Sequence, residues 1–133
     1  MRKLWLALFA LGFTLPAQAQ QSVVVPATTA QVSIAAGTLS ATKIVAGITG
    51  KQIYVTQVAM VPVATAVVTF TYGTGSACGT GTTAVAGVLT FATGQTLSVG
   101  NGNGAVWVIP SGQDLCLTIG TAGAPGSLAY SQF

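Results

Sequence analysis

Apolar and polar residues alternate with a period of two over short runs, and Gly, Asn and Pro separate these runs along most of the chain. In residues 66–72, Val68, Phe70 and Tyr72 fall on one face, and Val and Thr residues fall on the other. Successive side chains of a strand point to opposite faces, so this pattern predicts a half-buried β-strand. Residues 114–119 show the same alternation and predict a second strand, with Leu115, Leu117 and Ile119 pointing inward.

The remaining runs predict further short strands, with turn chemistry between them. The pairs of Asn and Gly in 101–104 favour a tight hairpin, and residues 110–113 and 124–126, each of which contains a Pro, favour β-turns. The predicted strands are residues 22–25, 31–35, 42–45, 51–61, 85–91, 96–99, 105–109 and 127–133. Helical periodicity is lacking after the N-terminal segment, so we predict an all-β chain: an antiparallel, jelly-roll-like β-sandwich of about 8–10 short strands, with a small barrel as the alternative.

The N-terminal segment follows a different pattern from the rest of the chain. Arg2 and Lys3 precede the apolar run 4–13, and small residues lead up to Ala19. These are the parts of a secretory signal peptide, so we assign residues 1–19 to one and expect cleavage after Ala19. The alternative is a membrane anchor, but the run is shorter than the roughly 20 residues that a spanning helix needs. We therefore expect no membrane span after cleavage.

The expected mature chain is long enough for one domain with a buried core. We divide it into an N-terminal strand or arm, residues 20–38, and a β-sandwich domain, residues 39–133. Export would place the protein in the periplasm, outside the cell or on its surface. An oxidising compartment favours a disulfide between Cys78 and Cys116, and a reactive thiol is the alternative.

The composition limits the kinds of catalytic and metal sites that the chain can form, because it has no His, no Glu and a single Asp, Asp114. General acid–base pairs, His-assisted nucleophiles and multi-ligand metal sites need several such groups in one pocket. We therefore predict no enzyme activity, no catalytic residues, no metal and no cofactor; a hydrolase built on Ser with Lys43 or Lys51 is the remaining enzymatic alternative. Two separated lysines also argue against nucleic acid as a partner.

Because the chain has so few charged residues, Thr, Ser, Gln and Ala must cover the exposed faces of its sheets. In a typical soluble monomer, about a quarter of the residues are charged. We predict that neighbouring copies cover much of the surface and protect the sheet edges, which makes the protein a homo-oligomer. The alternative is a monomer kept soluble by its hydroxyl groups. Trp107 and Tyr130 are the candidate ligand contacts, since an exposed aromatic ring could stack on a cell-surface glycan, although core or interface packing is the commoner role.

Two further segments have compositions that occur in ligand-binding loops. Residues 72–82 are rich in Gly but lack the Lys of a phosphate-binding loop, so we expect a long loop held by Cys78. Residues 101–104 offer carbonyl groups to a calcium ion, but no carboxylate lies nearby in the sequence, so we expect a turn.

Several stretches together resemble a family of small β-sandwich domains in the virion proteins of tailed bacteriophages. The resemblance covers about residues 39–133 and rests on turn and cysteine signatures that carry no chemistry: residues 40–55, 78–84, 102–106, 110–117 and 126–130. It implies a head-decoration or fibre component that is trimeric and that contacts capsid or tail proteins. The protein would then lie in the virion if a phage encodes it.

The export signal departs from that pattern, because virion proteins assemble in the cytoplasm. Two other interpretations therefore stay open. One is a secreted bacterial surface or pilin-like subunit that pairs its sheet edges with neighbours. The other is a carbohydrate-binding adhesion module.

Overall fold

The computed structural model describes residues 30–35, 40–120 and 123–133. The expected signal peptide and the predicted strand 22–25 lie outside these ranges. Ten strands and one short 3-10 helix, η1 (Ser76–Cys78), make up the described part, and all strand pairs in it are antiparallel. The all-β prediction is confirmed.

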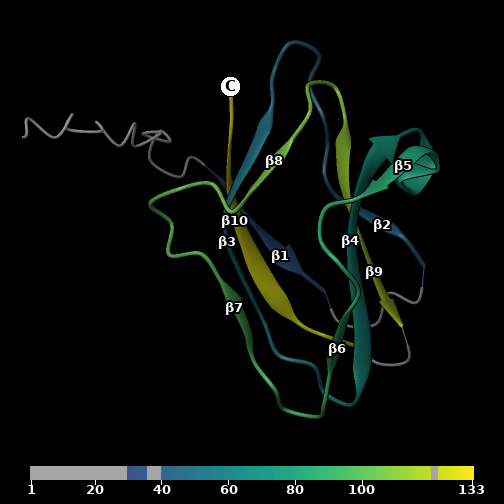
Figure 1. Cartoon of the computed structure of the whole chain (residues 1–133), viewed down its shortest axis with the longest axis vertical. Helices are drawn as coiled ribbons and strands as arrows, with labels where there is room; N and C mark the ends of the chain where they lie inside the picture. Colours follow the sequence, from purple (N-terminus) through teal and green to yellow (C-terminus); the bar gives the residue numbers. More distant parts are fainter. Residues whose placement is uncertain (1–29, 36–39, 121–122) are drawn as a thin grey trace, which may run out of the picture.

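The strands form two sheets that pack face to face (Figure 1). The first sheet, in spatial order, contains β1 (Ala30–Ile34), β10 (Gly126–Gln132), β3 (Ile53–Met60) and then both β7 (Leu97–Val99) and β8 (Trp107–Ile109). The second contains β2 (Thr42–Val45), β9 (Asp114–Gly120), β4 (Ala66–Thr74) and then both β5 (Thr80–Ala84) and β6 (Leu89–Phe91). The segment 20–38 thus contributes β1 to the sandwich.

The connections give this sandwich a jelly-roll topology. β7 and β8 pair with successive stretches of β3 and run in the same direction, so they are two parts of one interrupted strand. β5 and β6 lie along β4 in the same way. When each interrupted pair is counted as one strand, the chain changes sheet at every connection except the one from β4 to β5, as in a double-sheet jelly roll.

A β-bulge at Thr56 interrupts the pairing of β3 with β10 inside the first sheet. Gln57 pairs with Ala129 and Val55 pairs with Tyr130, so Thr56 is the extra residue of β3. Its carbonyl accepts a hydrogen bond from the Gly102 N–H at 3.2 Å. The predicted hairpin at 101–104 is therefore wrong: the two Asn-Gly pairs lie in a loop that leaves the edge of β3 at the bulge and returns to the same edge.

The core lies between the sheets and is filled from both. Phe70 is fully buried on β4, and its ring packs against that of Trp107 from the opposite sheet, with centroids 4.9 Å apart. The inward faces predicted for β4 and β9 are confirmed. The other large, fully buried apolar side chains are Ile53, Val55, Val58, Met60, Val68, Ile109, Leu115, Leu117, Ile119 and Leu128.

The predicted disulfide is confirmed. Cys78 and Cys116 are bonded, with Cα atoms 6.1 Å apart, and both are fully buried. The bond ties η1 to β9 on the outer side of the second sheet. The prediction that residues 72–82 form one long loop is wrong in part, because β4 extends to Thr74 and β5 begins at Thr80.

Candidate functional site

The two strands β1 and β2 are sheet edges on the same side of the sandwich. Among the described residues, β1 pairs only with β10, and β2 pairs only with β9. Each therefore presents one row of backbone N–H and C=O groups without a strand partner. Soluble proteins usually block such edges with Lys, Pro or inward charges, and β1 contains none of these.

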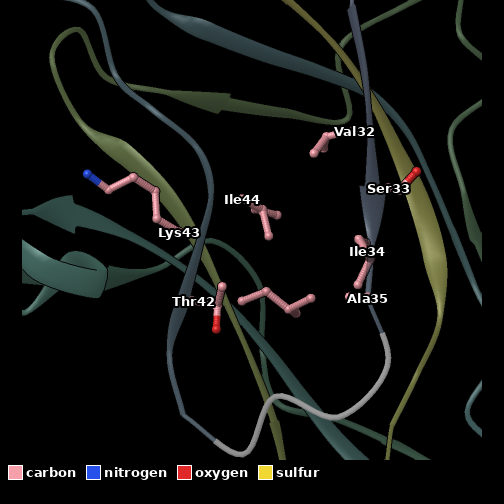
Figure 2. A pocket seen from close by; sticks show the side chains of 8 residues that line it. Val32, Ser33, Ile34, Ala35, Thr42, Lys43 and Ile44 are labelled. Atoms are coloured by element: carbon pink, nitrogen blue, oxygen red, sulfur yellow. The ribbon is translucent and has the colours of Figure 1, made fainter.

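A groove of about 150 Å³ lies between these two edges (Figure 2). Val32 and Ile34 of β1 and Ile44 of β2 point into it, whereas Ser33 and Lys43 point away. The alternation along β1 explains this arrangement, since Val32 and Ile34 share a face and Ser33 lies on the other. The lining residues are Val32, Ser33, Ile34, Ala35, Thr42, Lys43, Ile44 and Leu117. An apolar floor between two open backbone rows is suited to an extended segment of another chain.

An ion pair lies on the outer side of β2. Lys43 Nζ is 2.7 Å from Asp114 Oδ2, and the Gly47 N–H donates a hydrogen bond of 2.8 Å to Asp114 Oδ1. Burial raises the pKa of the Asp114 carboxyl, but these hydrogen bonds and the charge of Lys43 outweigh burial and hold the pKa below its ordinary value of 3.8. The only carboxylate side chain of the protein is thus neutralised in a structural contact, and Lys43 brings little free charge to the groove.

This ion pair predicts how the stability depends on pH. The pKa of Asp114 is lower in the folded state than in the unfolded state, so its contribution is present above the unfolded pKa and is lost as the pH falls through the folded pKa. Because the chain has no His and no Glu, we expect a constant free energy of unfolding from about pH 5 to 7. Below about pH 4 it should fall by at most about 1 kcal/mol, because Lys43 is partly exposed.

Urea unfolding at a series of pH values measures this effect, and Asp114→Asn is the matched control. The carboxyl terminus titrates equally in both proteins, so their difference isolates Asp114. An equal loss of stability in acid for both proteins would contradict the assignment, as would a decline between about pH 5 and 7.

Trp107 and Tyr130 lie on either side of Val55 in one cross-strand row of the first sheet. Directly paired residues point to the same face of a sheet, and Val55 is fully buried. Both rings are partly buried and pack against the core. The structure brings these two candidate ligand contacts into one row, on the inner face of the sandwich.

A different aromatic pair lies on the outer face of the same sheet. The rings of Tyr54 and Phe133 stack with centroids 4.3 Å apart, and Phe133 is 48% exposed. The Tyr54 hydroxyl donates a hydrogen bond to Gln52 Oε1. Sequence reasoning did not select these rings, although the alternation along β3 placed Tyr54 opposite the buried Ile53 and Val55.

Metal-ligating clusters and membrane-spanning helices are two further features that bear on function. In residues 30–35, 40–120 and 123–133, no group of three or more His, Cys, Asp or Glu side chains could hold a metal ion. No helix in these ranges is long and apolar enough to span a bilayer. Comparison of the chain with protein-family models, with curated proteins and with solved structures finds no match.

Proposed function

We propose that the protein is a non-enzymatic structural subunit that assembles with copies of itself, as a decoration or fibre component of a phage virion does. The observation behind this proposal is that β1 and β2 are edge strands among the described residues, with an apolar groove between them. A second copy of the chain is the proposed occupant of this groove.

The charge distribution supports a second copy as the partner. The chain has 4 basic residues and 1 acidic residue, so little repulsion opposes the approach of an identical molecule. Asp114 and Lys43 already neutralise each other. Association would cover apolar side chains that now line an open groove and would satisfy backbone groups at the strand edges, and both effects favour binding.

The jelly-roll topology supports the virion version of this proposal by analogy, because the same architecture recurs in viral capsid and lectin domains. A secreted bacterial surface or pilin-like subunit would use the same edges in the same way. Genes for capsid and tail proteins beside the gene for this chain would distinguish the phage role from the bacterial one.

The glycan-binding alternative receives less support from the geometry. An aromatic platform for a sugar must present an open ring face to solvent, whereas Trp107 packs on Phe70 and Tyr130 lies in the same inward row. The exposed part of Phe133 is the better candidate if a glycan binds at all.

A pair of valine-to-lysine variants tests the proposed assembly. Val32→Lys places a charge in the apolar groove (Figure 2), and Val88→Lys places the same charge at a position that is 65% exposed and does not line the groove. We expect the natural protein to sediment as a trimer or larger species. Val32→Lys should weaken association by at least about tenfold, which corresponds to about 1.4 kcal/mol, whereas Val88→Lys should have little effect.

Sedimentation velocity over a range of protein concentrations measures these equilibria, and circular dichroism checks that each variant is folded. A natural protein that stays monomeric at every concentration would overturn the assembly proposal. Equal weakening by both lysines would place the interface elsewhere on the surface and contradict the groove.

A further inference from the structure

The loop between β7 and β8 contains the two asparagines of the chain, Asn101 and Asn103, and each is followed directly by Gly. Both asparagines are exposed. The local sequence is thus nearly the same at the two positions, but the two Asn-Gly pairs differ in their hydrogen bonds.

The first pair is anchored to the sheet. The Gly102 N–H donates a hydrogen bond of 3.2 Å to the carbonyl of Thr56 at the β-bulge. The Asn101 side chain is held as well, because its Oδ1 accepts a hydrogen bond of 3.1 Å from the Asn103 N–H. Neither the Gly102 nitrogen nor the Asn101 carboxamide can change its position without breaking a contact.

The second pair has no such anchor. Among the described residues, neither the Asn103 side chain nor the Gly104 N–H makes a hydrogen bond. A Cβ atom placed on Gly104 would meet no atom within 4 Å, so the surroundings are open. The Gly104 nitrogen can therefore approach the Asn103 side chain through local motion of the loop alone.

We propose that Asn103 is a site of spontaneous deamidation and that Asn101 is protected by the bulge. The Gly104 nitrogen loses its proton and attacks Cγ of Asn103, a C–N bond forms, and the side-chain nitrogen leaves as ammonia. Water then opens the resulting succinimide at either carbonyl, which gives aspartate or isoaspartate. Glycine favours the attack because it has no side chain to hinder the approach.

The modification would add a carboxylate to a chain that has one acidic side chain. The loop follows β7, at the edge of the first sheet opposite β1, so the new charge would lie away from the groove. The modified form should separate from the unmodified form on isoelectric focusing. This proposal does not depend on the proposed assembly.

Peptide mass spectrometry of the folded protein, aged in mildly alkaline buffer, tests the proposal. We expect the product at Asn103 to form about tenfold faster than the product at Asn101, a ratio that corresponds to about 1.4 kcal/mol in the barrier. In protein that is reduced and unfolded in urea, both Asn-Gly pairs lose their surroundings, so the two rates should become similar.

Gly104→Ala is the matching variant, because the position is open and its backbone lies outside the left-handed region. The added methyl should slow the reaction at Asn103 several-fold. Gly87→Ala, at another open glycine, is the control and should leave the rate unchanged. Equal rates at both asparagines in the folded protein, or a faster reaction at Asn101, would overturn the proposal. Reaction in the unfolded protein without any product at Asn103 in the folded protein would do so too.

Discussion

Replacing Phe70 with alanine is expected to lower the free energy of unfolding by about 3–5 kcal/mol. The ring is fully buried on β4 and packs against Trp107 across the two sheets. Alanine would therefore leave a cavity at the point where the sheets meet, and the strands around it are held by their backbone pairing and can collapse only in part. A loss of this size is a large fraction of the 5–15 kcal/mol that stabilises a typical domain.

Urea denaturation monitored by fluorescence measures this loss, since Trp107 is the only tryptophan outside the expected signal peptide. Phe133→Ala removes the same ring from a position that is 48% exposed, and it should cost less than about 1 kcal/mol. Similar losses for the two variants would mean that Phe70 does not lie in the core.

Removing the disulfide should have the second largest effect. The bond joins residues 38 positions apart, and in the chain-entropy model a loop of this length stabilises the fold by about 3–4 kcal/mol. The variant with both Cys78→Ala and Cys116→Ala avoids leaving a free thiol. Hydrogen exchange should accelerate most in η1 and β5, because this segment is held to β9 by the bond and its strand is exposed along its whole length.

Chemical unfolding of the double variant beside the natural protein gives the magnitude. Reduction of the natural protein provides an independent control and should reproduce the loss. Titration of two free thiols in the natural protein after purification without reductant would show that the bond does not form, and an unchanged free energy of unfolding would show that it does not stabilise the fold.

Strands with regular alternation could be read from the sequence. The prediction at 42–45 coincides with β2, and 114–119 lies within β9. In β9 the apolar residues Leu115, Leu117 and Ile119 recur at every second position, because one face of the strand must be buried. β5 was missed because all five of its residues, mainly Thr and Gly, are exposed at an edge, so burial left no pattern in them.

At residues 101–104, the prediction from local residue preferences was wrong. Asn-Gly pairs favour a hairpin, but β7 and β8 do not pair with each other. Each of them pairs with β3 instead, and the bulge at Thr56 sets the gap between them. The same bulge provides the carbonyl that holds Gly102. A bulge depends on the pairing of β3 with β10, which lies far away in the sequence, and local residue preferences carry no information about it.

The sequence by itself therefore determined the fold class, the face that β4 and β9 bury and the partner of each cysteine, because burial acts on residue type directly and two cysteines allow one pairing. The tertiary structure alone decided which strands are edges, that β1 and β2 border one apolar groove, and that Lys43 pairs with Asp114. It also turned Trp107 and Tyr130 toward the interior and left Phe133 exposed. These features depend on the order of strands in the sheets, which long-range pairing fixes and local alternation does not.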